Sequence, residues 1–270
     1  MRGPSRASLA AAREQLTAAL ADPSGAAALG DELLAVGHLL DTEPGLRRAL
    51  TDATSPVPAR EGLVTELLDG RVSGPTLELA VGMAGARWSA PRDLADAAEE
   101  LGVLAISAAA EGEGQLDDLE DELFRFGRIL SGEPDLRTAL MNPAVPANGK
   151  RDLLDTLLAG KVTPAALRLI TQAAVHPRGR NLDITLESYA RLAAAWRQRL
   201  IAIVRTASGL DDDQRARLAA ALSRTYDHEI HLNVVIDPGV VGGMSIQIGD
   251  EVIDGSVASR LAQLRQRLAS

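Results

Sequence analysis

The chain contains the same stretch of sequence twice, and this duplication limits the folds open to it. Residues 32–50 and 122–140 align without a gap at a shift of 90 and are identical at ten of 19 positions. A second match follows, in which residues 67–73 correspond to residues 157–163. Chance would give about one identity in such a window, so the match indicates an internal duplication. Because two copies are too few for a solenoid, we predict two similar small domains in series.

Both copies have the pattern of short helices separated by proline and glycine. In the first copy we expect helices over residues 8–21, 26–40, 46–51, 59–68 and 76–88, because Pro and Gly residues interrupt the chain between them. The pattern predicts a mainly α protein with two tandem bundles of about six helices each, followed by a small α+β domain. The predicted domains are residues 1–97, 98–195 and 196–270. Short links between such domains would let them flex.

The last forty residues alternate between apolar and polar side chains, which is typical of strands with one buried face. The alternating runs are His231–Asp237 and Met244–Ile248. Gly249-Asp250 then separates the second run from residues 251–253, as expected of a tight hairpin. An apolar run at residues 200–204 predicts one more strand. A helix is expected from Asp213 to about His228, because Asp211–Asp213 place acidic residues at its first turn.

A final amphipathic helix is expected after Asp254-Gly255-Ser256, because Ser256 or Asp254 can cap it. Its apolar stripe repeats at spacings of four and three and consists of Val257, Leu261, Leu264 and Leu268. Two interpretations remain open. The stripe covers the small sheet, or its distal part extends beyond the sheet as a docking face for a partner helix.

The C-terminal stretch resembles the δ subunit of bacterial F-type ATP synthase, which corresponds to the mitochondrial oligomycin-sensitivity-conferring protein. The match is ordered and nearly gapless, and actinobacterial members of this family are long in a similar way. The signature residues that carry it are Asp237, Pro238, Gly242, Gly243, Gly249, Asp250, Asp254, Gly255 and Ser256.

The resemblance implies a non-catalytic subunit of the peripheral stalk. Such a subunit links the N-terminal helix of an α subunit, at the top of the catalytic head, to the C-terminal end of the b subunit. It resists rotor torque during proton-driven ATP synthesis. The implied location is the cytoplasmic face of the bacterial cell membrane, where the subunit is peripheral and held through the complex.

The resemblance also suggests where partners bind. In the family, an α-subunit helix lies between the first and fifth helices of the six-helix domain, which corresponds here to residues 98–195. The candidate partner-binding residues are therefore Leu101, Leu104, Leu167 and Ile170 in the helical region, and Leu261, Leu264 and Leu268 in the last helix. The first copy is a departure from the family, and the sequence leaves open which copy holds an α helix.

Composition excludes several other functions. The formal charge is 28 − 37 = −9, which argues against nucleic acid or an anionic membrane surface as the main partner. The chain has no cysteine and therefore no thiol nucleophile or cysteine metal site. Its longest apolar run, residues 101–110, falls short of the roughly 18 residues of a membrane span. We expect a soluble chain without direct membrane insertion.

Motifs of catalysis and cofactor binding are incomplete, so we expect no cofactor, metal or catalytic site. Gly149-Lys150-Arg151 lacks the rest of a phosphate-binding loop and predicts a loop glycine beside a solvated lysine. Ser245 sits in an incomplete G-x-S-x-G pattern within an alternating strand, which leaves a hydrolase as a weak alternative. His228 and His231 lack a third ligand for zinc.

Two acidic clusters, residues 93–100 and 117–122, could be mistaken for catalytic carboxylates. We expect both to lie at helix starts and on outward faces as solvated charge. His38 is expected on or near a bundle face, and His176 in a loop without an assigned role. A helical adaptor of some other assembly remains the alternative interpretation of the whole chain.

Overall fold

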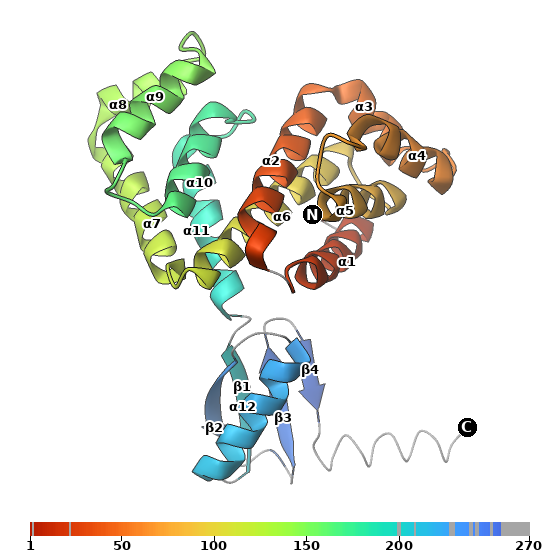
Figure 1. The fold of residues 1–270 in the computed structure, drawn as a ribbon, viewed down its shortest axis with the longest axis vertical. Coiled ribbons are helices and arrows are strands. Elements are labelled where there is room, and N and C mark those ends of the chain that lie inside the picture. Colours follow the sequence, from red (N-terminus) through yellow and green to blue (C-terminus); the bar gives the residue numbers. More distant parts are fainter. Residues whose placement is uncertain are drawn as a thin grey trace. The chain divides into compact units, whose positions relative to one another are not determined.

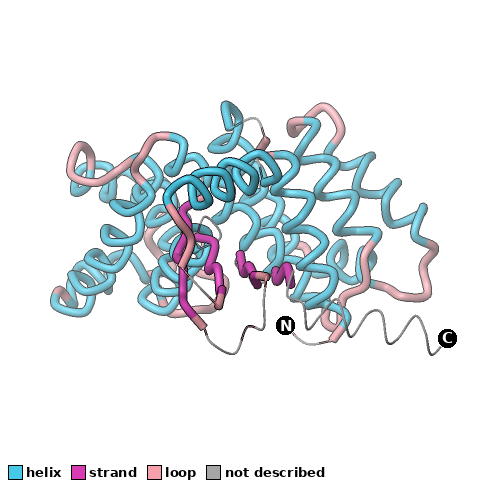
Figure 2. Tube along the Cα trace, turned by 90° about the horizontal axis from the view of Figure 1, so that it is seen from below, coloured by secondary structure: helices cyan, strands magenta, loops and turns pink. Residues whose placement is uncertain are grey.

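The computed structural model describes residues 1, 3–21, 23–198, 201–207, 209–226, 230–237, 240, 243–248 and 251–254. The chain forms two compact units, Met1–Ala193 and Ala194–Ser270, and the division falls within one helix. The first unit is helical, and the described strands belong to the second (Figures 1 and 2). The protein is mainly α with a C-terminal α+β region, as the sequence predicts.

Several helices of the first unit begin at a proline. A proline at the first helical position loses no hydrogen bond, because that N–H has no partner within the helix, and its fixed φ angle suits the helix. Helices α1, α3, α6, α8 and α10 begin in this way. The helices are α1 (Pro4–Ala19), α2 (Ala26–Thr42), α3 (Pro44–Thr51), α4 (Val57–Leu68), α5 (Gly74–Gly85), α6 (Pro91–Gly112), α7 (Leu116–Gly132), α8 (Pro134–Met141), α9 (Ala147–Leu158), α10 (Pro164–Val175) and α11 (Leu182–Gln198), with a 3₁₀ turn at Pro23–Gly25.

The duplication seen in the sequence is repeated in the structure. Helices α2, α3, α4 and α5 have counterparts α7, α8, α9 and α10, whose bounds are shifted by 90 residues each. The turns after α4 and α9 both use a glycine in the left-handed region, Gly70 at φ 69° and Gly160 at φ 72°. A side chain other than glycine is strained at such angles, so the same backbone turn is built twice.

One polar contact is also built twice, and it connects the second helix of each copy to the start of the fifth. The Glu32 carboxylate accepts hydrogen bonds from the Ser73 amide at 3.0 Å and from its hydroxyl at 2.6 Å. Glu122 accepts the same pair of bonds from Thr163, at 2.8 and 2.7 Å. The contact places a negative charge at a helix N-terminus, where the helix dipole favours it. Glu122 is therefore buried and bonded, and the prediction that it is solvated was wrong.

Helix α6 belongs to both copies. It is 22 residues long, continues without a break through the predicted domain boundary at residues 97/98, and is buried at each position from Leu101 to Ala108. In the first copy it takes the place that α11 takes in the second, and it also opens the second copy. The two copies are thus joined by a common helix, where short links were expected.

Helix α2 packs closely along α6 because both carry glycine at the crossing. A Cβ atom at Gly30 would lie 2.6 Å from Ile106 Cγ1 and 3.0 Å from the Gly102 carbonyl oxygen. A Cβ atom at Gly102 would in turn lie 2.7 Å from Leu34 Cγ. Only glycine allows the two helix backbones to approach this far, and the contact fixes α2 against α6.

The second unit contains a four-stranded sheet with the order β2-β1-β3-β4. Strand β1 is parallel to β2 through the crossover helix α12, and β1–β3 and β3–β4 are antiparallel. Leu218 and Leu222 of α12 pack on one face of the sheet, against a core that includes Ala202, Val204 and Ile246. The elements are β1 (Ile201–Thr206), α12 (Asp212–Tyr226), β2 (His231–Ile236), β3 (Met244–Ile248) and β4 (Glu251–Asp254).

These strands match the alternation in the sequence to within one or two residues at most ends. Leu232 and Val234 contact the core, as their alternation predicts. Ile236 continues the same pattern but is 62 % exposed, because it ends the edge strand β2. The final helix expected after Ser256 lies outside the described residues.

A candidate partner groove along helix α10

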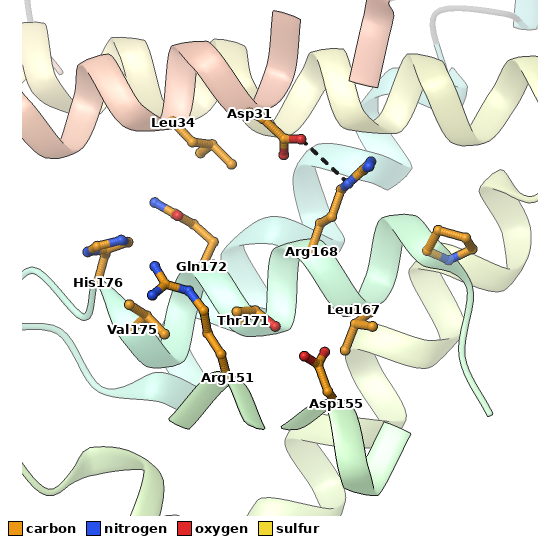
Figure 3. Close-up of a pocket in the computed structure, with 11 residues that line it drawn as sticks. Asp31, Leu34, Arg151, Asp155, Leu167, Arg168, Thr171, Gln172, Val175 and His176 are labelled. Carbon is orange, nitrogen blue, oxygen red and sulfur yellow. Dashed lines mark ion pairs between the residues drawn. The ribbon is translucent and has the colours of Figure 1, made fainter. Parts of the chain in front are cut away.

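A groove with a volume of about 410 Å³ runs along α10 in the first unit. Helix α10 supplies its floor, α9 one side and α2 the other (Figure 3). Its lining residues are Asp31, Leu34, Arg151, Asp155, Pro164, Leu167, Arg168, Thr171, Gln172, Val175 and His176.

The sequence of α10 explains why this helix has a free face. Thr163 caps its start by accepting a hydrogen bond from the Ala166 amide at 3.2 Å. Side chains at helical spacing then face the core, among them Leu169 and Ile170, which are fully buried. Leu167, Thr171 and Val175 repeat every four residues on another side and line the groove. The helix therefore carries one stripe for the core and one that remains half-exposed.

An ion pair crosses the groove from the second copy to the first. Arg168 Nε of α10 lies 3.6 Å from Asp31 Oδ2 of α2, and both side chains remain partly exposed, at 43 % and 51 %. Burial raises the pKa of Asp31, and the Arg168 guanidinium offsets part of that rise. An exposed pair of this kind contributes about 1 kcal/mol or less, so a ligand can separate it at little cost.

Two histidines meet at the other end of the groove. The ring of His176, which follows α10, lies 3.8 Å from the ring of His38 on α2, measured between centroids. Burial, followed by the charges of His38 and Arg151, lowers the pKa of His176 to about 4. Both rings lie where the two copies meet, although the sequence suggested only a bundle face for His38 and a loop for His176.

A buried ionic network holds α2 beside α10. Arg178, in the loop between α10 and α11, lies 3.3 Å from Asp41 of α2 and 2.6 Å from Asp96 of α6. It also pairs with the buried carboxylate of Glu99 on α6. Desolvation lowers the pKa of Arg178, but the carboxylates of Glu99, Asp96 and Asp41 together raise it above its ordinary value. This guanidinium thus joins the first copy to the second.

Glu99 is surrounded by donors from the second copy. The Tyr189 hydroxyl of α11 donates a hydrogen bond to it at 2.6 Å, and Arg180 donates to both of its oxygens. Burial, and then the nearby Glu99 carboxylate, raise the pKa of Tyr189 well above its ordinary value. The prediction that the cluster at residues 93–100 is outward-facing solvated charge was wrong for Glu99, which is 4 % exposed.

The prediction for Lys150 was also wrong. The sequence suggested a solvated lysine in a loop, but Lys150 lies within α9 and is only 5 % exposed. Its ammonium group donates to the Ala174 carbonyl near the end of α10 at 3.3 Å, and burial lowers its pKa. The lysine therefore caps a helix C-terminus, where a positive charge is favoured.

The residues that the resemblance suggested for partner binding differ in their exposure in the structure. Leu167 lines the groove. Leu101 and Leu104 of α6, and Ile170 of α10, are at most 3 % exposed and form part of the core of this chain. Leu261, Leu264 and Leu268 lie outside the described residues. The residues that sequence reasoning missed are the charged and polar members of the groove, above all Asp31, Arg151 and Arg168.

Signature residues of the C-terminal stretch are described in part. The Asp237 amide donates to the Thr206 carbonyl at 2.9 Å, which continues the β1–β2 pairing beyond β2. Gly243 has φ 79°, a left-handed angle that suits glycine, and Asp254 pairs with Ser245 across β3 and β4. The remaining signature residues lie outside the described part of the chain: Pro238, Gly242, Gly249, Asp250, Gly255 and Ser256.

The described residues also bear on catalysis, metal binding and membrane insertion. Ser245 is half-buried within strand β3, with Arg205 and Asp254 as its cross-strand neighbours. No group of three His, Cys, Asp or Glu residues in the described ranges could hold a metal ion. Within the same ranges, no helix is both long and apolar enough to cross a membrane.

Comparisons with known proteins agree with the resemblance. The chain is 48 % identical over 270 residues to the ATP synthase subunit delta of Streptomyces avermitilis, with 99 % of this chain and 98 % of that protein covered. It is 46 % identical to the ATP synthase subunit delta of Streptomyces griseus subsp. griseus and to that of Acidothermus cellulolyticus, with full coverage of both chains in each case. These relatives therefore also match the first helical copy.

A solved structure and a family model complete the comparison. A chain in the Toxoplasma gondii mitochondrial ATP synthase hexamer matches 62 % of this chain and 95 % of its own length at 21 % identity, with a TM-score of 0.34. The family model described as ATP synthase delta (OSCP) subunit matches residues 103–268, which include the groove helices α9 and α10 and the C-terminal unit. The chain belongs to the ATP synthase delta (OSCP) subunit family.

Proposed function

We propose that this chain is a non-catalytic connector in the peripheral stalk of an F-type ATP synthase. It ties the catalytic head to the membrane-anchored b subunit and keeps the head from turning with the rotor during proton-driven ATP synthesis. Family membership supports the subunit identity. The observation that carries the mechanism is the groove along α10, because it offers a helix-sized surface inside the family-matched region.

The proposed occupant of the groove is the N-terminal helix of an α subunit. The floor residues Leu167, Thr171 and Val175 extend over two turns of α10, and Pro164 and His176 mark the ends of the groove. Twelve residues of α-helix are about 18 Å long, which suits about three turns of a partner helix laid against α10. An amphipathic helix would place its apolar stripe on Leu167 and Val175 and its polar side toward solvent.

Exposed apolar side chains favour the second copy as the one that meets partners. In the described helices of this copy, Phe124, Ile129, Leu157 and Ile184 are large apolar residues that remain 36–57 % exposed. Among the described helical residues of the first copy, only Val57 belongs to this class, at 43 %. Apolar surface that is more exposed in one copy than in its duplicate supports a role in binding there.

The C-terminal unit is the proposed contact for the end of the b subunit. Its edge strands carry exposed apolar residues, Val235 and Ile236 in β2 and Val252 and Ile253 in β4, with exposed fractions of 41–62 %. Leu261, Leu264 and Leu268 would add an apolar stripe if their segment forms the expected helix. Through the α and b subunits the chain would be peripheral to the cytoplasmic face of the bacterial cell membrane.

A binding experiment with the full chain tests both contacts. Fluorescent peptides would represent the N-terminus of the α subunit and the C-terminus of the b subunit from the same organism, and anisotropy would report their binding. Leu167→Arg should weaken the α peptide about tenfold or more, because it places a charge on the groove floor. Leu77→Arg is the matched control, since residue 77 is the counterpart of residue 167 in the first copy.

The outcomes separate the parts of the proposal. Loss of α-peptide binding in Leu77→Arg but not in Leu167→Arg would move the site to the first copy. Removal of residues 255–270 should abolish binding of the b peptide and leave the α peptide unaffected. If neither peptide binds the unmodified chain, the connector function is wrong.

A further inference from the structure

The groove on the second copy has one side that the second copy does not make. Asp31 and Leu34 line it and belong to α2, which is part of the first copy. The family model matches from residue 103 onward and does not include α2. The shorter region that defines the family would therefore have α10 and α9 in this place, but no α2.

Helix α2 is fixed in this place by several independent contacts. The glycine crossing of Gly30 with Gly102 holds it on α6. The ion pair between Asp41 and Arg178 holds its C-terminal end to the loop after α10. The ring contact from His38 to His176 connects it directly to the end of the groove, and the exposed ion pair from Asp31 to Arg168 adds a weaker link. These contacts make α2 a firm wall.

One face of α2 points toward α10 along the length of the groove. Asp31 and His38 both contact residues of the groove floor or its end, and they are seven residues apart on the helix. Ala35 lies between them at a spacing of four and three and is exposed. Residues at such spacing share a helix face, so Ala35 faces the same space. A small side chain there leaves room for a partner.

We propose that the first copy supplies the second wall of the partner groove, and that Asp31 and Ala35 of α2 help to determine which helix binds there. The proposal rests on the function proposed above and assigns a role to the added copy. A partner helix that lies on α10 would be contacted by α2 on its other side. The added copy would then contribute to affinity directly, in addition to any role as a spacer.

Charge along the groove describes the partner further. Asp31 and Arg168 place one charge of each sign at the first half of α10, Asp155 of α9 adds a second carboxylate, and Arg151 and His176 lie toward the end of α10 (Figure 3). Arg151 donates to Asn148 at 3.2 Å, an exposed contact that leaves its other nitrogen atoms available. The groove thus fits an amphipathic helix of about three turns that presents a carboxylate to Arg151.

The test compares substitutions in α2 with the floor substitution Leu167→Arg, using the full chain and the fluorescent N-terminal peptide of the α subunit. Ala35→Trp fills the space between the walls, and Asp31→Arg opposes Arg168 with a like charge. Each should weaken peptide binding about tenfold. Ala59→Trp is the matched control, because Ala59 is an exposed helical alanine of the first copy outside the groove. Thermal unfolding would confirm that each variant folds.

The results distinguish this inference from the function on which it rests. If Leu167→Arg abolishes binding while Ala35→Trp and Asp31→Arg bind as the unmodified chain does, α2 is no wall and the inference is overturned. If Ala59→Trp weakens binding as much as Ala35→Trp, the effect is unspecific and the inference is equally overturned. If the unmodified chain does not bind the peptide at all, both the inference and the proposed function fail.

Discussion

Arg60 and Lys150 occupy the same position in the two helical copies, and each donates to the carbonyl groups that end the fifth helix of its copy. The Arg60 guanidinium donates to the carbonyls of Ala84 at 2.7 Å and Ala86 at 2.9 Å, and also to those of Leu50 and Gly85. Among the described residues, the Lys150 ammonium group donates only to the Ala174 carbonyl, at 3.3 Å. The planar guanidinium reaches several acceptors where an ammonium group reaches one.

This difference predicts that Lys150→Arg stabilises the second copy and Arg60→Lys destabilises the first. Each change alters two or three hydrogen bonds to buried carbonyls, so we expect shifts of about 1–3 kcal/mol in the free energy of unfolding, with opposite signs. Urea unfolding followed by circular dichroism measures both. A destabilised Lys150→Arg would show that the second copy has no room for the larger head group.

The glycine crossing of α2 and α6 gives a second prediction. Gly30→Ala should destabilise the protein by about 1–3 kcal/mol, since its Cβ atom would lie 2.6 Å from Ile106 Cγ1. Gly127→Ala, in α7, is the control because nothing lies within 4 Å of its added Cβ atom. That change should stabilise the protein by about 0.5–1 kcal/mol through helix propensity. Equal effects of both changes would refute the close approach.

The network around Glu99 predicts a graded loss of stability. Arg178→Met removes the main cation from a buried carboxylate and should cost about 3–5 kcal/mol. Tyr189→Phe removes one of the hydrogen bonds to Glu99 and should cost about 1–3 kcal/mol. Thermal or urea unfolding of the two variants tests the order. A larger loss for Tyr189→Phe than for Arg178→Met would contradict it.

The lowered pKa of His176 predicts that the protein loses stability in weak acid. Its pKa in the folded protein is about 4, below the ordinary value of 6.5, so the unfolded chain binds the proton more readily. Stability should therefore be full above about pH 6.5 and should fall as the pH decreases from there toward 4. His176→Gln should flatten this part of the curve of unfolding free energy against pH. A curve identical to that of the unmodified chain would mean that other groups govern the acid range.

The features that could be predicted from the sequence are those coded locally. The duplicated helices follow from proline and glycine at fixed spacing, and strands β2 and β3 follow from alternation over five or six residues. Leu167 could be named as a partner-binding candidate only through the family resemblance. The resemblance named Leu101 and Ile170 as well, and both are buried in this chain.

The features that could not be predicted depend on partners far apart in the chain. Glu99 is buried because Arg178, Arg180 and Tyr189 surround it, and they lie about eighty to ninety residues away. Arg178 itself adopts φ 50°, a left-handed angle that is uncommon for any residue but glycine, and no local pattern marks it. The wall of the groove made by Asp31 was equally hidden, because nothing in the sequence places α2 beside α10.

Helix α6, which both copies share, determines how the added copy transmits force. Two domains joined by a flexible linker can rotate independently when force is applied to them. Here a force on either copy is transmitted to α6, an unbroken helix of 22 residues that is about 33 Å long and packs in both copies. Removal of either copy would therefore also remove a helix from the other copy. The duplication thus enlarges the compact helical unit and adds no flexible link within it.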